Sequence, residues 1–209
     1  MQALDYLKID NNGPSKKAII FIHGWKGNKN SFKTLPSILK INNASWVFPQ
    51  APYKVNDGKD AYTWAYQNKK GDWEQKESKI LLKEFIEKIV LSKFDSKQVF
   101  FIGFSQGATV CYEFLFSLKY PWGGIFPVAG FFRNFKRGIT LNDIQKKTII
   151  YIGHGIKDNV IPLESSERSY QFLLKNDYNV YFEKYKGGHK ISLDYLKKIS
   201  IIINKSNEQ

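Results

Sequence analysis

The stretch QVFFIGFSQGATVCYEF, residues 98–114, decides the fold. It begins with the apolar run VFFI, which is typical of a buried strand, and it continues after Gly107 with the pattern of a helix. Between the two, Gly103-Phe104-Ser105-Gln106-Gly107 fits the G-x-S-x-G turn that presents a serine between a strand and a helix. Glycines remove the Cβ atoms that would clash in such a turn. We therefore predict that Ser105 is a nucleophile held at the end of a buried strand.

Short apolar runs alternate with longer amphipathic segments along the rest of the chain. Strands are predicted at Ala18–His23, Trp46–Phe48, Val99–Gly103, Gly124–Val128, Thr148–Gly153 and Val180–Tyr185, and helices at Ser31–Lys40, Glu77–Leu91, Gln106–Leu118, Leu163–Leu174 and Ser192–Ile203. This alternation favours an α/β fold with a doubly wound, mostly parallel sheet and helices on both faces. The mixed pattern of Val180–Tyr185 indicates an edge strand. Residues 1–209 are predicted to form a single domain with no large lid domain, and residues 53–75 are its longest insert without assigned structure.

Composition limits the classes of function. Hydrophobic residues make up 43% and charged residues 24% of the chain, which is ordinary for a soluble globular protein. The N-terminal residues lack the apolar core of a signal peptide, and the single cysteine, Cys111, excludes an intramolecular disulfide and favours a reducing compartment. We therefore expect a cytoplasmic protein.

The formal net charge of +13 raises the question of nucleic-acid binding. The lysines are dispersed in pairs such as Lys69-Lys70, with no long basic block and no aromatic RNA-recognition motif. A solvated basic surface is therefore the prediction, without nucleic acid as a partner. A weak contact with anionic membranes or acidic partners is left open.

A serine nucleophile needs a base to take its proton. In the fold that carries this turn, the acid and then the histidine follow the serine in the chain. Of the three histidines, His23 precedes Ser105. His154 would need Asp143 as its acid, whereas His189 is the last histidine and follows a strand and a double-glycine turn. We predict His189 as the base.

The acid that orients His189 should lie in a loop after a strand, between residues 105 and 189. Asp158 follows the predicted strand Thr148–Gly153 by five residues and is the predicted acid. Asp143 precedes that strand, Asp177 follows a helix, and Glu164 is a nearby rival. Asp158 is chosen on its position, since an isolated aspartate in a loop is usually a turn former.

The oxyanion of an acyl-transfer intermediate needs backbone N–H donors. Gln106, directly after the nucleophile, and Trp25, in the loop after the first predicted strand, are the predicted donors. His23 and His154 are expected to brace loops. Trp64, Phe131 and Phe132 are candidates for an apolar acyl pocket, with a place in the core as the alternative. No metal-binding or phosphate-binding motif is present in the sequence, and we predict neither a metal nor a cofactor.

The segments HGWKGN, PQAP, GFSQG, HGIKDNVIP and GGHKIS follow one another over about residues 18–190. In this order they resemble the carboxylesterase, phospholipase and acyl-protein thioesterase family of the α/β-hydrolase fold. The resemblance implies Ser105 as nucleophile, Asp158 as orienting acid, His189 as base, and Trp25 and Gln106 as oxyanion donors. It also implies hydrolysis of carboxylic esters or thioesters through an acyl-enzyme.

Three departures from the family pattern are visible. The turn His23–Asn28 is longer than the usual HGxGD, Ala108 replaces a common glycine, and Trp64-Ala65-Tyr66 echoes the substrate-loop motif only loosely. With little room for a lid, small or medium acyl groups are the expected substrates, and the protein is expected to be a monomer or homodimer. The alternatives are a peptidase of the same fold, a dienelactone-hydrolase-like enzyme, a non-catalytic ligand-binding relative and a basic surface-binding protein.

Overall fold

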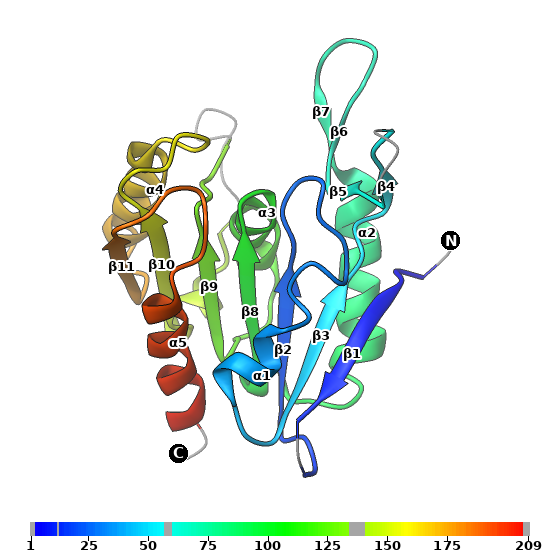
Figure 1. The fold of residues 1–209 in the computed structure, drawn as a ribbon, viewed down its shortest axis with the longest axis vertical. Helices are drawn as coiled ribbons and strands as arrows, with labels where there is room; N and C mark the ends of the chain where they lie inside the picture. Colours follow the sequence, from blue (N-terminus) through cyan, green and yellow to red (C-terminus); the bar gives the residue numbers. More distant parts are fainter. Residues whose placement is uncertain (1–2, 12, 57–59, 134–140, 207–209) are drawn as a thin grey trace.

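A seven-stranded sheet organises the computed structural model, which describes residues 3–11, 13–56, 60–133 and 141–206. Its strands are β1 (Tyr6–Asp10), β2 (Lys17–Ile22), β3 (Ala44–Pro49), β8 (Val99–Phe104), β9 (Gly124–Val128), β10 (Ile150–Gly155) and β11 (Val180–Tyr185). They lie in the order β1-β3-β2-β8-β9-β10-β11 (Figure 1). Strand β1 runs antiparallel to β3, and every other neighbouring pair is parallel. The predicted mostly parallel sheet is confirmed, and β11 is an edge strand as expected.

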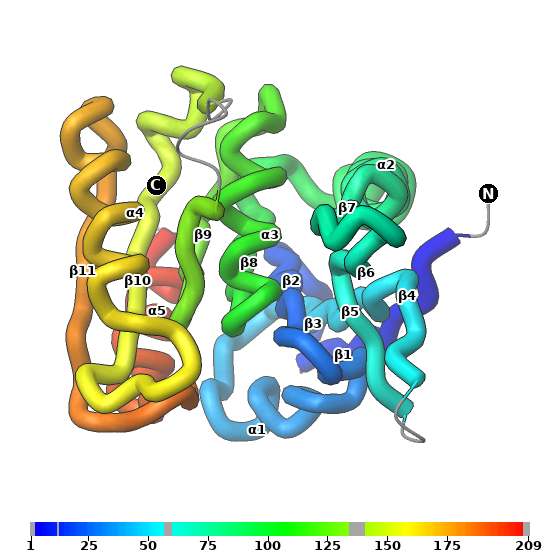
Figure 2. Tube along the Cα trace, turned by 90° about the horizontal axis from the view of Figure 1, so that it is seen from above, coloured from blue at the N-terminus to red at the C-terminus, as the bar shows by residue number. Residues whose placement is uncertain are grey.

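Helices cover both faces of this sheet (Figure 2). One face carries α2 (Lys76–Phe85), α3 (Gln106–Phe114) and α4 (Leu163–Lys175), and the other carries α1 (Leu35–Leu39) and α5 (Leu193–Lys205). Side chains of successive strand residues alternate between the two resulting cores: Phe101 packs with the first group of helices, and Phe100 and Ile102 pack with the second. Because both faces are covered, the central strands are continuously apolar.

Several boundaries differ from the predictions. Strand β1 was not predicted, because its two aliphatic residues, Leu7 and Ile9, are only partly buried and are separated by Lys8. Helix α1 begins at Leu35, since residues 30–34 form turns. Strand β10 is shifted by two residues and therefore includes His154. Short helical turns extend or join the main elements at Ile86–Val90, Ser96–Gln98, Leu115–Ser117 and Asp143–Lys147.

The insert 53–75 forms two small antiparallel pairs within its described part. These are β4 (Tyr53–Lys54) with β5 (Tyr62–Thr63) and β6 (Tyr66–Gln67) with β7 (Trp73–Glu74). The β6–β7 hairpin extends beyond the carboxyl ends of the parallel strands (Figure 1). Within the described ranges, no helix combines the length and the apolar composition needed to cross a bilayer.

The turn between β8 and α3 packs against β2 with no space for side chains. A methyl group added at Gly107 would overlap the carbonyl oxygen of Ile22. At Gly103, an added methyl group would lie 2.6 Å from both Cys111 Sγ and the carbonyl oxygen of Gly107. The two glycines of the motif therefore allow helix α3 to begin directly against the neighbouring strand.

We expect Gly107→Ala to lower the free energy of unfolding by about 3 kcal/mol or more, because the clash is with backbone that cannot rotate away. Gly71→Ala is the control: Gly71 has a φ of +81° but an added Cβ meets nothing within 4 Å. That variant should lose only about 1 kcal/mol, from the backbone conformation alone. Urea denaturation measures both. Equal losses in the two variants would show that the close approach at Gly107 is unimportant.

Candidate active site

Ser105 occupies a strained position directly between β8 and α3. Its backbone has φ 56° and ψ −117°, which costs a non-glycine residue about 1–3 kcal/mol. The turn is held from both sides, since the Ser105 N–H donates to the Val128 carbonyl at 2.9 Å and the Ser105 carbonyl accepts from Thr109 at 3.1 Å. This conformation presents the Ser105 side chain at the carboxyl end of the sheet.

The loop after β11 brings His189 to the same place. Its turn at Gly187-Gly188 packs directly on Gly155, where an added methyl group would overlap the carbonyl oxygens of both glycines. The Gly187 carbonyl accepts from the Lys157 N–H at 2.9 Å, and the Tyr185 hydroxyl donates to the Lys190 carbonyl. The loops after β10 and β11 are therefore held together by contacts that do not involve the side chains of Asp158 and His189.

Ser105, His189 and Asp158 form one hydrogen-bonded chain. His189 Nε2 lies 2.9 Å from Ser105 Oγ, and His189 Nδ1 lies 2.7 Å from Asp158 Oδ2. A carboxylate can only accept, so Nδ1 carries the proton of the neutral ring and Nε2 accepts from the serine hydroxyl. The structure thus brings together the three predicted residues with the polarity that a Ser-His-Asp triad requires.

The side chain of Asp158 is wholly buried, and both of its carboxylate oxygens accept hydrogen bonds. Its Oδ1 accepts from the backbone N–H groups of Val160 at 2.8 Å and Ile161 at 2.9 Å, while Oδ2 accepts from His189. Burial by itself raises the pKa of the carboxyl group, but the donors from Ile161, His189 and Val160 outweigh it and hold the pKa below its ordinary value. Asp158 is therefore an anion at neutral pH.

The predicted oxyanion donors lie next to the nucleophile. Gln106 is the first residue of α3, where backbone N–H groups have no partner within the helix. The loop that carries Trp25 runs beside the turn at residues 103–107, which we call the elbow, since a Cβ at Gly24 would lie 3.2 Å from Ser105 Cβ. The roles of the Trp25 and Gln106 N–H groups remain predictions.

His23 braces this loop, as expected. Its Nδ1 donates to the Gly24 carbonyl at 2.8 Å, and its Nε2 accepts from the Ala51 N–H at 3.1 Å. The ring is buried, and this burial lowers its pKa to about 4. His23 is therefore neutral at physiological pH and holds the loop by two directed hydrogen bonds.

The side chain of Gln106 connects the elbow to the insert 53–75. Its Oε1 accepts from the Trp64 N–H at 3.0 Å, and its Nε2 donates to Thr63 Oγ1 at 2.8 Å. Trp64 is 0% exposed and donates from its indole nitrogen to the His23 carbonyl at 2.9 Å. The expectation that Trp64 lines a substrate pocket must be corrected, because a wholly buried ring offers no surface to a ligand in this structure.

The two candidate phenylalanines, Phe131 and Phe132, differ in their exposure to solvent. Phe132 is buried in the core, with its ring centroid 4.7 Å from that of Tyr112. For Phe132 the pocket expectation is therefore corrected too, and the alternative of a core residue holds. Phe131 is partly exposed and follows Gly130, where an added Cβ would lie 2.9 Å from the Ser105 carbonyl oxygen. Phe131 remains a candidate for contact with substrate.

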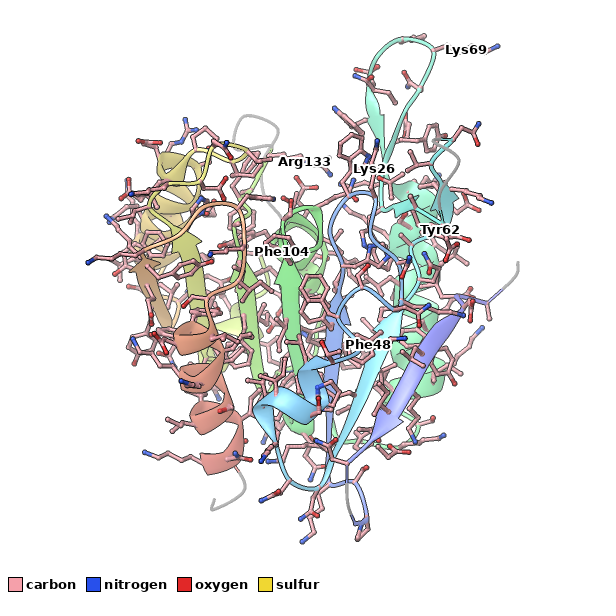
Figure 3. All side chains as sticks on the ribbon, viewed as in Figure 1. Lys26, Phe48, Tyr62, Lys69, Phe104 and Arg133 are labelled. Atoms are coloured by element: carbon pink, nitrogen blue, oxygen red, sulfur yellow. The ribbon has the colours of Figure 1, made fainter. Side chains whose placement is uncertain are left out.

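Sequence reasoning missed one aromatic neighbour of the site. The ring of Phe104, at the carboxyl end of β8 (Figure 3), lies 5.0 Å from the His189 ring between centroids and is itself supported by Phe32 at 5.8 Å. Its position directly before the nucleophile in the motif was the available signal. Among the described residues, no three His, Cys, Asp or Glu side chains gather as a metal-binding group.

Comparisons with known proteins identify relatives of this chain. Acyl-protein thioesterase 1 of Kluyveromyces lactis is 26% identical over 214 residues, covering 92% of this chain and 93% of that protein. Acyl-protein thioesterase 1 of Saccharomyces cerevisiae is 28% identical over 221 residues, covering 92% and 94%. The crystal structure of esterase PE8 shares the fold with a TM-score of 0.83 at 18% identity, covering 98% of this chain and 99% of that one.

The match to a family profile extends over nearly the whole chain. Residues 7–207 match the profile described as phospholipase/carboxylesterase, so the matched region contains Ser105, Asp158 and His189. This chain therefore belongs to the phospholipase/carboxylesterase family.

Proposed function

We propose that this protein hydrolyses carboxylic esters or thioesters with Ser105 as nucleophile, His189 as general base and acid, and Asp158 as the group that orients His189. The observation that carries the proposal is the hydrogen-bonded chain Asp158–His189–Ser105, with distances of 2.7 and 2.9 Å. The strained backbone of Ser105 supports it, because strain of this kind persists where surrounding contacts hold it for function.

In the first half of the reaction, Ser105 Oγ attacks the carbonyl carbon of the substrate while its proton passes to His189 Nε2. The resulting oxyanion accepts hydrogen bonds from the Gln106 and Trp25 N–H groups. When the tetrahedral intermediate collapses, the bond to the leaving oxygen or sulfur breaks and His189 Nε2 gives its proton to that atom. Asp158 stabilises the charged imidazole between the two transfers.

Water completes the cycle. It attacks the acyl-enzyme carbonyl as His189 Nε2 accepts one of its protons, and collapse of the second intermediate breaks the bond to Ser105 Oγ. The proton on His189 then returns to Ser105, and the carboxylic acid leaves. Every proton is accounted for by one imidazole, and the residues named here complete the cycle.

The family and the site support a proposal for the substrate class. The relatives named acyl-protein thioesterase favour a thioester of an acylated protein, and we propose small or medium acyl groups, with Phe131 in contact with the acyl chain. Dienelactone-hydrolase-like chemistry is disfavoured because it uses a cysteine where this chain has Ser105.

A weak contact with anionic membrane surfaces is the second part of the proposal. The β6–β7 hairpin presents Trp73, which is 55% exposed, together with the exposed Lys69 and Lys70. Figure 3 shows Lys69 at the tip of the hairpin, pointing away from the sheet. An aromatic ring beside basic side chains suits the headgroup region of an anionic bilayer. We propose that the protein is cytoplasmic and acts as a monomer or homodimer.

Removing either member of the proton-transferring pair should abolish hydrolysis. We expect Ser105→Ala and His189→Ala to lower kcat for p-nitrophenyl butyrate roughly 10⁴-fold or more, and both to lose labelling by a fluorophosphonate probe. Asp158→Asn should cost roughly 10²–10⁴-fold, because the ring loses its anionic partner. Ser117→Ala, which removes a hydroxyl bonded to the Phe114 carbonyl, is the control and should label normally. Labelling that survives in folded Ser105→Ala would identify another nucleophile.

The oxyanion donor in the loop after β2 can be tested by removing a single N–H. Trp25→Pro deletes the backbone donor, and Trp25→Ala keeps it while removing the same exposed ring. We expect the proline variant to lose roughly 10²–10³-fold in kcat relative to the alanine variant, with both melting alike. If the two variants turn over equally, the second donor must be sought elsewhere.

The membrane contact predicts a specific loss of vesicle binding. Vesicles of phosphatidylcholine with phosphatidylserine should sediment the wild type at low salt, and vesicles of phosphatidylcholine alone should not. Reversing the charges of Lys69 and Lys70 to glutamate should weaken binding roughly tenfold or more, at about 1 kcal/mol per charge. The same reversal at the exposed Lys197 and Lys198 of α5 is the control for net charge. Equal losses in both double variants would mean that no particular surface faces the membrane.

A further inference from the structure

A second histidine lies against the Asp158 carboxylate and takes no part in the mechanism above. His154, near the end of β10, is 0% exposed, and its Nε2 lies 3.4 Å from Asp158 Oδ2 and 3.0 Å from the Ile161 carbonyl oxygen. Its Nδ1 lies 2.7 Å from Ser166 Oγ, and Ser166 Oγ lies 2.6 Å from the Gly130 carbonyl oxygen. Ser166 is equally buried. These contacts form a continuous buried polar chain beside the triad.

The proton positions in this chain follow from its acceptors. Both neighbours of His154 Nε2 are acceptors only, a carboxylate and a carbonyl, so Nε2 carries a proton in every charge state. Burial lowers the pKa of His154 more than its neighbours raise it, which favours a neutral ring with Nδ1 as acceptor. The Ser166 hydroxyl has a single proton, which it donates either to His154 Nδ1 or to the Gly130 carbonyl oxygen. His154 therefore directs a donor at the loop of Asp158.

Gly130, at the far end of this chain of hydrogen bonds, packs against the elbow. A Cβ added at Gly130 would lie 2.5 Å from Ala108 Cβ and 2.9 Å from the Ser105 carbonyl oxygen, so Gly130 packs directly on the turn of the nucleophile. Ser166 belongs to α4. Through Ser166, the hydrogen bonds of the His154 ring therefore connect the loop after β10, which carries Asp158, with α4 and with the loop after β9. A displacement of the loop after β10 would break the buried hydrogen bond between His154 Nε2 and the Ile161 carbonyl, while the bond from Nδ1 to Ser166 keeps the ring itself attached to α4. Such a loss is costly when no water can replace the bond.

We propose that His154 and Ser166 are positioning residues that hold the Asp158 carboxylate, and through it His189, in register with Ser105. The inference rests on the proposed function, because it assigns these residues to that same site. It predicts a loss in kcat with little change in KM, since the chain does not touch the substrate. If the role were purely structural, the variants would be less stable, but their kcat would equal that of a control variant destabilised by the same amount.

Three variants distinguish the ring's donor from its volume. His154→Leu replaces the ring with an apolar group of similar size that has no donor. Ser166→Ala interrupts the chain of hydrogen bonds with little change in side-chain volume. His154→Gln places an amide N–H near the position of Nε2. We expect His154→Leu to lower kcat about 10–100-fold, Ser166→Ala about 3–10-fold, and His154→Gln to recover most of the loss, because small displacements of a catalytic group are costly.

Thr148→Val is the matched control. Thr148 precedes the same strand at its opposite end, is buried, and accepts from the Trp122 N–H at 3.1 Å while donating to Gln145 Oε1 at 3.0 Å. Its loss removes a buried hydroxyl with two partners, as in Ser166→Ala, but without a connection to Asp158. We expect Thr148→Val to melt at a lower temperature and to keep its kcat.

A second readout separates this inference from the proposed function. Proton NMR of each variant observes the low-field signal of the His189 Nδ1–H shared with Asp158, which does not require turnover. We expect the signal to persist in Thr148→Val and His154→Gln and to shift or disappear in His154→Leu. An unchanged signal and kcat in both His154→Leu and Ser166→Ala would overturn the positioning role, as would equal losses in the glutamine and leucine variants. Failure of the proposed function would appear instead as full hydrolysis by Ser105→Ala.

Discussion

The close contact between the elbow and strand β2 is the constraint on which the rest of the site depends. Gly107 lies against the Ile22 carbonyl with no space for a side chain, and a Cβ added at Gly103 would lie 2.6 Å from the Gly107 carbonyl oxygen in the first turn of α3. Because the helix begins there, the chain reverses within a few residues and Ser105 takes a conformation that few non-glycine residues adopt. The same contact places Gln106 at the free N-terminus of α3 and brings the Trp25 loop alongside.

The remaining functional groups arrive from neighbouring strands of the same sheet. Parallel strands direct their carboxyl ends to one edge, so the loops after β2, β8, β10 and β11 meet there without a separate domain. Side-chain hydrogen bonds then set the final geometry. His23 holds one loop, and Gln106 ties the insert to the elbow through Trp64. Two backbone donors hold Oδ1 of the Asp158 carboxylate, which leaves Oδ2 to accept from His189.

Much of this arrangement could be predicted from the sequence, for identifiable reasons. The central strands are covered on both faces and are therefore almost continuously apolar, so β2, β8 and β9 could be predicted from their apolar runs. Strand β1 was missed because it has only two aliphatic residues, both partly buried, and they alternate with exposed residues. The G-x-S-x-G motif, the order of acid and base along the chain and their positions after predicted strands selected three residues that the structure joins by hydrogen bonds.

Other features depend on contacts that no local pattern reports. The aromatic residues Trp64 and Phe132 were candidates for a pocket, but whether such a ring faces a ligand or the core is decided by distant partners such as His23 and Tyr112. His154 was expected to brace a loop near Asp158. Its contact with the carboxylate depends on β10 extending to Gly155 through pairing with β11, which the apolar pattern alone did not reveal.

The central claim is that the elbow makes Ser105, and no other hydroxyl, the nucleophile. Its most direct test is to react the wild-type protein with a fluorophosphonate, digest it, and locate the adduct by tandem mass spectrometry. The account predicts a single modified site at Ser105, with the modification lost when His189 is replaced by alanine. An adduct at any other residue, or an unmodified Ser105 in well-folded protein, would contradict it.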